Sequence, residues 1–186
     1  GLDDSEMISD DRLQADNIED YFNKFIPHDA CWDLEKRGEV GETPFHLLIL
    51  MDTPVHFEVA RILLNLYPNL ALDIYEGEEY YGESALHIAI VIGNFDLVKM
   101  LVSAGALVNQ RATGRFFLPE DQKQGYTGRT NYKGYAYYGE YPLAFAACLG
   151  NKDIYDYLLD HGADPDLQDS FGNTVLHMVV ISDQSV

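Results

Sequence analysis

The sequence predicts an all-α solenoid of stacked helix-turn-helix repeats with long finger loops, and three observations support this fold class. A seven-residue motif that begins with glycine recurs four times along the chain. In each copy, residues suited to the first turn of a helix follow that glycine. After each of the first three copies, apolar residues at helical spacing predict a second helix. Such a pair of helices buries its apolar face only against the next pair, so we expect the repeats to stack in a row.

The recurring motif marks the start of an inner helix in each repeat. Its copies span 41–47, 82–88, 139–145 and 172–178. A side-chain hydroxyl can accept from the free amides of a first helical turn, and proline is tolerated there because it lacks a donor. We therefore interpret these residues as structural: Thr43, Ser84, Pro142 and Thr174. The motif is the ankyrin signature, so the expected fold is an ankyrin-repeat solenoid.

Three of the four copies carry a histidine at the sixth position, namely His46, His87 and His177. An imidazole at this place can bond the backbone of the neighbouring turn. We therefore interpret these histidines as structural, and not as ligands or catalytic bases. Ala144 occupies the position in the third copy, which argues against a shared catalytic role.

Apolar stripes predict the outer helices. The segment 95–102 has apolar residues at helical spacing, and Gly105 can supply the left-handed residue that ends it. Two further segments repeat the pattern, with Ile154, Tyr157 and Leu158 before Gly162, and with Val59, Ile62, Leu63 and Leu66 before Tyr67. We expect three leucines of the motif to be buried between repeats: Leu86, Leu143 and Leu176.

The spacing of the copies predicts long insertions in the fingers. The step from Gly139 to Gly172 is the usual ankyrin period, whereas the two earlier steps are longer. We expect an acidic tail at 1–11 and an ankyrin-repeat domain at 12–186. Its parts are the end of a preceding repeat (12–40), repeats at 41–81, 82–138 and 139–171, and the start of a further repeat (172–186). The second of these repeats contains the insertion 109–138. We expect the chain to be a fragment of a longer array.

The charge of the chain is strongly one-sided. There are 31 acidic residues against 12 basic ones, which gives a formal net charge of -19. Such a field repels nucleic acid and anionic headgroups and attracts basic segments. It disfavours nucleic-acid binding, and it leaves the tail either solvated or in contact with a basic partner. No apolar stretch approaches the roughly 20 residues of a membrane helix. We therefore expect no segment of this sequence to span a bilayer.

The sequence offers no convincing catalytic, cofactor or metal site. Asp164, Asp166 and Asp169 lack the spacing and the distal glutamate of a calcium loop. No glycine-rich phosphate loop is present, and no serine has a histidine and an acid at suggestive positions. Cys31 and Cys148 have no companion at metal spacing, and Cys148 is expected to be a small core residue. We expect a binding domain and not an enzyme.

Aromatic and acidic residues gather in two fingers and give the candidate partner-binding site. Its residues are Tyr75, Glu78, Glu79, Tyr80, Tyr81, Phe116, Phe117, Tyr132, Tyr135, Tyr137 and Tyr138. Tyrosine offers a large contact area and a hydroxyl, which suits an interface. The alternative is that the rings pack on each other and hold the long loop against its own repeats. The sequence leaves both interpretations open.

Three segments resemble the cytosolic ankyrin domain of vanilloid-type transient receptor potential channels. They are 79–90 (EYYGESALHIAI), 138–148 (YGEYPLAFAAC) and 169–177 (DSFGNTVLH). Three others are more similar to the invertebrate Nanchung and Inactive-type branch: 114–117 (GRFF), 119–123 (PEDQK) and 130–135 (TNYKGY). The resemblance covers nearly the whole chain.

This resemblance implies a cytosolic assembly, protein-interaction and regulatory domain of a non-selective, calcium-permeable cation channel in sensory transduction. It implies neighbouring subunits of a homo- or hetero-tetramer as partners, with calmodulin as a further candidate. It also implies the cytoplasmic face of the cell membrane, with membrane contact only through a pore domain absent from this sequence and a sensory cilium as one candidate location. The alternatives are a stand-alone ankyrin adaptor, or a small-ligand sensing module at the aromatic fingers.

Some members of this family bind nucleotide triphosphate on the concave face, through lysines and an aromatic residue. Tyr80 matches the aromatic residue, but Glu42 and Leu47 stand where those members have lysines. A polyphosphate needs cationic donors, so we do not transfer this site. We expect no bound cofactor.

Overall fold

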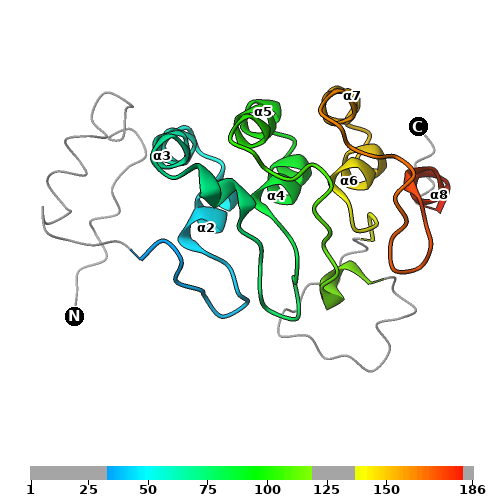
Figure 1. The fold of residues 1–186 in the computed structure, drawn as a ribbon, viewed down its shortest axis with the longest axis horizontal. Helices are drawn as coiled ribbons and strands as arrows, with labels where there is room; N and C mark the ends of the chain where they lie inside the picture. Colours follow the sequence, from blue (N-terminus) through cyan, green and yellow to red (C-terminus); the bar gives the residue numbers. More distant parts are fainter. Residues whose placement is uncertain (1–32, 119–136, 182–186) are drawn as a thin grey trace, which may run out of the picture.

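The computed structural model describes residues 33–118 and 137–181, which form a row of stacked helix pairs (Figure 1). The inner helices are α2 (Pro44–Met51), α4 (Ala85–Ile92), α6 (Pro142–Cys148) and α8 (Val175–Ile181). The outer helices are α3 (Pro54–Leu66), α5 (Phe95–Ser103) and α7 (Lys152–Asp160). Two short 3-10 helices, η3 (Pro68–Leu72) and η4 (Arg115–Phe117), lie in the connections. In the described ranges there are no strands, only an isolated bridge between Ile74 and Ser84, so the all-α prediction is confirmed.

Each inner helix starts where the motif predicts. The backbone of Thr43 is extended just before α2, and its hydroxyl accepts from the backbone N–H of His46 at 3.4 Å. The first glycine of the motif is required by its backbone. Gly82 has a φ of +85°, and a Cβ there would lie 2.1 Å from the carbonyl oxygen of Arg111. Only glycine fits both the left-handed conformation and this close approach.

Two outer helices follow the predicted stripes, and one differs. Leu97 and Leu101 of α5 are buried, as are Ile154 and Leu158 of α7. In α3 the buried residues are Ala60 and Leu64, and neither belongs to the apolar stripe that the sequence predicted. Val59, Ile62 and Leu63 are only partly buried, and Leu66 is exposed at the end of the helix. The helix is apolar on more than one side, so its sequence did not identify the face that packs against α2 and α5.

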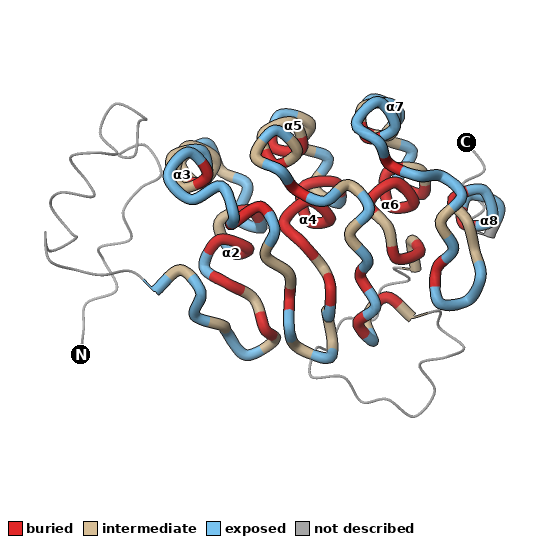
Figure 2. Tube along the Cα trace, viewed as in Figure 1, coloured by how far each residue is buried: buried red, intermediate tan, exposed pale blue. Residues whose placement is uncertain are grey.

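One core runs through the row, with its buried residues on the facing sides of the helices (Figure 2). Leu86 and Leu143 are almost fully buried, as predicted, but Leu176 at the same motif position is 72% exposed. In the interior repeats the helix that carries this leucine packs on the following inner helix, as α4 does on α6 and α6 does on α8. No helix within the described ranges follows α8, so its leucine stays open. Among the described residues, no helix has the length and apolar content needed to span a bilayer.

Candidate functional site

The fingers between the helix pairs share one hydrogen-bond register. The N–H of Tyr75 donates to the carbonyl of Glu83 at 2.7 Å, and the N–H of Ala112 donates to that of Glu140 at 2.8 Å. The same contact recurs further along, from Asp169 to Asn173 at 2.9 Å. Equivalent residues of successive fingers can therefore be compared directly.

The start of the long insertion lies along the preceding finger. The N–H groups of Thr113 and Gly114 donate to the carbonyl of Tyr81 at 2.8 and 2.9 Å. The N–H of Phe116 donates to the carbonyl of Glu79 at 2.8 Å. A Cβ at Gly114 would lie 2.4 Å from that same carbonyl oxygen, so glycine allows the close approach. The insertion is thus anchored at its first end by backbone hydrogen bonds.

The candidate aromatic residues form a connected cluster across the fingers. Its ring centroids lie 5.7 Å apart for Tyr75 and Tyr80, 5.0 Å for Tyr80 and Phe116, 5.4 Å for Phe116 and Phe117, 5.8 Å for Phe117 and Phe145, and 5.6 Å for Tyr138 and Phe145. These distances are within the range of favourable aromatic pairs. Tyr75 and Phe117 are buried, so much of their surface is used within the chain. The geometry supports the packing interpretation for these rings.

The other candidate residues have different surroundings. Tyr81 is exposed, and the Glu78 carboxylate is exposed and pairs with Arg115 at 3.1 Å. Glu79 is partly buried. Tyr137 lies apart from the cluster, in a polar network described below. Tyr132 and Tyr135 lie outside the described residues, as do the predicted tail 1–11 and the expected helix at 12–25.

Two of the motif histidines connect an inner helix to a finger beyond it. Nδ1 of His87 accepts the N–H of Ser84 at 3.2 Å, so its Nε2–H donates to the carbonyl of Glu140 at 3.3 Å. His46 is held in the same way by Thr43 at 3.1 Å and by the carbonyl of Asp73 at 3.2 Å. Burial lowers the pKa of both imidazoles from 6.5 to about 4. These two rings are therefore neutral structural links at neutral pH.

The third motif histidine is in the last described helix. Nδ1 of His177 lies 2.8 Å from the hydroxyl of Thr174, and the pair is exposed. The local arrangement at the start of α8 thus resembles that of the two buried histidines.

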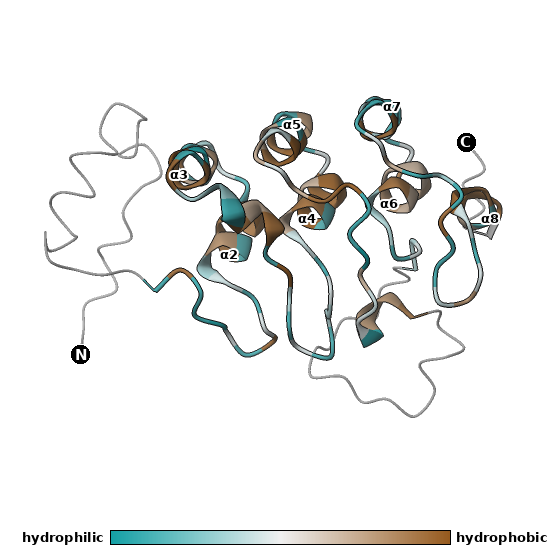
Figure 3. Ribbon diagram, in the orientation of Figure 1, coloured by the Kyte–Doolittle hydropathy of each residue, from teal (hydrophilic) through white to brown (hydrophobic). Residues whose placement is uncertain are grey.

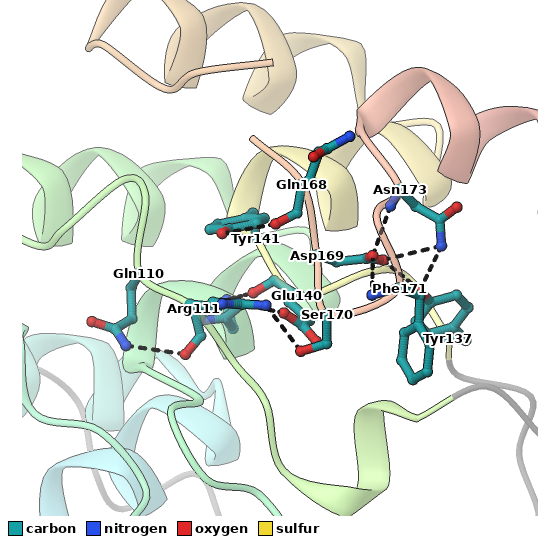
Figure 4. A network of polar contacts seen from close by, with 11 residues as sticks. Gln110, Arg111, Tyr137, Glu140, Tyr141, Gln168, Asp169, Ser170, Phe171 and Asn173 are labelled. Carbon is teal, nitrogen blue, oxygen red and sulfur yellow. Dashed lines mark hydrogen bonds and ion pairs between the residues drawn. The ribbon is translucent and has the colours of Figure 1, made fainter. Parts of the chain in front are cut away.

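An ion pair between the exposed Arg111 and the buried Glu140 lies in the finger between α5 and α6 (Figure 4). The carboxylate of Glu140 is 2% exposed and accepts from Nε of Arg111. The same guanidinium donates from Nη2 to the hydroxyl of Ser170 at 2.9 Å and lies over the ring of Tyr141. The hydrogen bond to Glu140 raises the pKa of Arg111. One arginine thus links the finger between α5 and α6 to the finger that precedes α8.

A second polar cluster organises the last described finger. Asp169 is buried, and its Oδ1 accepts the N–H groups of Phe171 at 2.9 Å and Asn173 at 2.8 Å. Its Oδ2 accepts from the hydroxyl of Tyr137, and Asn173 donates to that hydroxyl at 3.1 Å. Burial raises the pKa of Tyr137, as does the hydrogen bond to Asp169. Tyr137 therefore fixes the second end of the insertion to the following finger.

Glu83 differs from Glu140 although both follow the first glycine of the motif. In the part of the chain that the structure describes, Glu83 has no ion pair and its side chain is partly buried. Ile74 stands at the register position where Arg111 stands for Glu140. Burial raises the pKa of the Glu83 carboxyl to about 8.

Sequence reasoning did not identify Arg111, Glu140 or Asp169 as site residues. The recurring Gly-Glu dipeptide was a signal for the two glutamates, but it did not show which of them would have a cation beside it. Within the described ranges, no cluster of His, Cys, Asp or Glu could hold a metal ion. A cavity of about 260 Å³ lies beside α6, α7 and α8 and includes Tyr155 and Leu176 in its lining, so it is not at Tyr80.

Comparisons with known proteins match this arrangement. A family described as ankyrin repeats (3 copies) matches residues 15–112, and one described as ankyrin repeats (many copies) matches 141–185. The chain is 39% identical over 158 residues to transient receptor potential cation channel subfamily V member 5 of Rattus norvegicus, which is 85% of this chain and 20% of the relative.

Two further relatives carry the same channel name. The chain is 38% identical over 166 residues to subfamily V member 6 of Homo sapiens, which is 89% of this chain and 20% of the relative. It is 44% identical over 117 residues to subfamily V member 4 of Homo sapiens, which is 61% of this chain and 12% of the relative. The chain spans about a fifth of the length of the first two relatives.

Proposed function

The chain belongs to the ankyrin-repeat family, and on that premise we propose that it is the cytosolic assembly, protein-interaction and regulatory domain of a vanilloid-type cation channel. The observation that carries this proposal is the 39% identity to a channel subunit over 85% of the chain. A non-selective, calcium-permeable pore and a role in sensory transduction belong to the same proposal.

The finer parts of the proposal rest on particular segments. The Nanchung and Inactive-type branch rests on 114–117, 119–123 and 130–135, and a sensory cilium would follow from that branch. A position at the cytoplasmic face of the cell membrane follows from the channel relatives. The division into a tail at 1–11 and repeats within 12–186 is also proposed.

The partners we propose are neighbouring channel subunits in a homo- or hetero-tetramer, contacted through the fingers and the insertion 109–138. Exposed Tyr81 and Glu78 are available in the finger beside the start of this insertion. Calmodulin is a further candidate by family. Calmodulin usually binds basic amphipathic helices, and the uncharged inner helices of this chain are not of that kind.

The described fold suits a rigid coupling element. Helix pairs stack directly on their neighbours, and polar links such as His87 to Glu140 and Arg111 to Ser170 cross from one repeat to the next. Each repeat contacts only its neighbours, so a force or a displacement caused by a bound partner at one end of such an array is transmitted through the packed contacts between repeats. Binding and mechanical coupling, not catalysis, are therefore the activities we propose.

The test is to clone the transcript that contains this sequence and to express its full product. We expect long apolar segments after the repeats, cation currents in whole-cell recordings, and crosslinked tetramers at the membrane. A product without such segments and without currents would overturn the proposal and favour a stand-alone ankyrin adaptor.

A small-ligand sensing module at the aromatic fingers is the other alternative. Tyr80 packs against Tyr75 and Phe116, which occupies much of its ring surface. Thermal shift against a ligand panel, with Tyr80→Ala beside Tyr67→Ala as an exposed control, would distinguish the two. A ligand shift that disappears only in Tyr80→Ala would favour sensing.

A further inference from the structure

The outer helices α3, α5 and α7 combine hydrophilic and hydrophobic residues (Figure 3). The inner helices α2, α4, α6 and α8 contain no Asp, Glu, Lys or Arg, whereas the outer helices carry residues of both signs. Charged residues normally cover the solvent side of a helix. An uncharged inner row therefore either is fully buried or presents an apolar surface.

Part of this inner row is exposed. Four residues at or just after the C-terminal ends of three inner helices form the surface that we call the inner apolar strip: Leu50, Met51, Val91 and Leu149. Their exposed fractions are 55%, 58%, 50% and 37%. Leu50 and Val91 share one motif position, and Met51 and Leu149 share the next. Because α2 packs on α4 and α4 packs on α6, these positions follow one another along the row.

Carboxylates lie at the opposite end of the same helices. Glu42 and Glu83 each follow the first glycine of the motif, just before α2 and α4. The Glu42 carboxylate accepts the N–H of Val40 at 3.1 Å, and neither glutamate forms an ion pair within the described ranges. An eight-residue helix is about 12 Å long, so this distance separates the acidic end from the strip.

The nearest arginine in the register is already engaged. Arg37 stands before Glu42 as Arg111 stands before Glu140, but its guanidinium donates to the carbonyls of Gly41 and Ile74 and pairs with Glu76 at 3.4 Å. At the same motif position, Glu140 forms an ion pair with the guanidinium of Arg111. Glu42 and Glu83 have the same place in the repeat without that cation.

We propose that the inner apolar strip, together with Glu42 and Glu83, is a docking surface for a Lys/Arg-bearing amphipathic helix of a partner protein. This rests on the proposed function, which it deepens by giving the partner's chemistry. A helix is about 10–12 Å wide with its side chains, so one lying along the row can place its apolar face on the strip and its basic edge at the two glutamates.

Charge decides between this partner and others. A nucleotide, an anionic membrane or an acidic protein would meet the Glu42 carboxylate and a chain with a formal net charge of -19. The Glu83 carboxyl, whose pKa burial raises to about 8, would exchange its proton for a cation that the partner brings. A fully apolar helix would use the strip but leave the glutamates unpaired. A basic amphipathic helix satisfies both features.

The test uses the whole chain and a fluorescein-labelled synthetic peptide of leucine and lysine, about 18 residues long and amphipathic as a helix. Fluorescence anisotropy at about 0.15 M salt gives the Kd. Two control peptides are used, one with the same composition in scrambled order and one with glutamate in place of lysine. Binding of the first peptide with Kd at least about tenfold tighter than either control is expected.

Two double variants address the two parts of the surface. Glu42→Gln with Glu83→Gln removes the two carboxyl groups that would pair with the basic edge of the partner, and Leu50→Gln with Val91→Gln removes exposed apolar side chains. Each is expected to weaken binding about tenfold or more. The matched control is Asp153→Asn with Asp160→Asn, which makes the same acid-to-amide substitutions on exposed residues of the outer helix α7 and is expected to change Kd less than about twofold.

Several results would overturn the proposal. They are no binding of the amphipathic peptide, equal binding of the scrambled or acidic peptide, or equal weakening by the α7 control. Thermal melts of every variant show that a loss of binding is not a loss of fold. A failure here leaves the channel proposal standing, because that proposal is tested separately by membrane currents.

Discussion

Glu83 and Glu140 occupy the same position of successive repeats, yet their surroundings are opposite. Glu140 is buried beside the guanidinium of Arg111, whereas Glu83 has no ion pair among the described residues and faces Ile74 at that register position. Burial without a cation raises the pKa of Glu83 to about 8. The difference shows that a repeated motif fixes where a side chain lies, and that the residue opposite it in the same finger decides its chemistry.

The leucines of the motif give the largest expected effect and extend the comparison to packing. Leu86→Ala should reduce the free energy of unfolding by about 2–5 kcal/mol, because it opens a cavity in the core. Leu176→Ala at the same motif position should change it by less than about 0.5 kcal/mol, because that side chain is exposed. Urea unfolding measures both. Equal losses would contradict the difference between interior and end repeats.

The next change converts the surroundings of Glu140 into those of Glu83. Arg111→Ile should reduce the free energy of unfolding by about 2 kcal/mol at neutral pH, since it leaves a buried carboxylate unpaired. Arg61→Ile is the matched control, because Arg61 pairs with Glu58 on the exposed side of α3 and its loss should be much smaller. A smaller loss for Arg111 than for Arg61 would show that Glu140 does not need its cation.

The fold and the candidate site could be predicted only in part from the sequence. Helix starts such as Thr43 and outer helices such as α5 were predicted correctly, because capping residues and apolar spacing act locally. The exposure of Leu176 and the buried face of α3 were not predicted, because both depend on which other helices pack against the helix that carries these residues. The site was harder still, since Arg111 and Glu140 are 29 residues apart in the sequence and meet only when their finger folds.

The two interpretations of the aromatic residues illustrate the same limit. Composition placed Tyr80 and Phe116 in neighbouring fingers but could not distinguish an interface from internal packing. Backbone hydrogen bonds from Phe116 to Glu79 bring the rings together, and nothing in the local sequence specifies these bonds. Tyr137 was predicted as a partner-binding residue, yet its hydroxyl is bonded within the chain to Asp169.

Glu83 should give the chain an unusual loss of stability as the pH rises. The native carboxyl has a pKa of about 8 against an ordinary value of 4.5, so the folded state keeps a proton that the unfolded state has lost between these values. Its contribution to stability is therefore full below pH 4.5 and is lost as the pH rises through 8. Urea unfolding from acid to alkaline pH should show this decline in the wild type.

Two substitutions should remove that decline. Glu83→Gln abolishes the titrating group, and Ile74→Arg supplies the cation that Glu140 already has. Glu140→Gln serves as the matched change in the paired repeat and should leave the decline in place. A decline that persists in Glu83→Gln would assign it to another group.

The buried histidines predict a smaller effect of opposite sign. His87 has a pKa of about 4 in the folded chain against 6.5, so the unfolded state binds the extra proton between these values. Stability should therefore fall as the pH decreases from 6.5 to 4. His87→Ala should flatten part of this acid limb, with His161→Ala on α7 as the exposed control. An unchanged limb in His87→Ala would contradict the assignment.

The most direct test of the central comparison is the titration of the Glu83 carboxyl in the folded chain. Carbon-detected NMR of a glutamate-labelled sample, with Glu83→Gln for assignment, follows this group alone. A midpoint near 8, moved to acid in Ile74→Arg, is the predicted result. A midpoint near the ordinary 4.5 in the wild type would show that Glu83 is solvated like any surface carboxylate, and the account of the two repeats would fail.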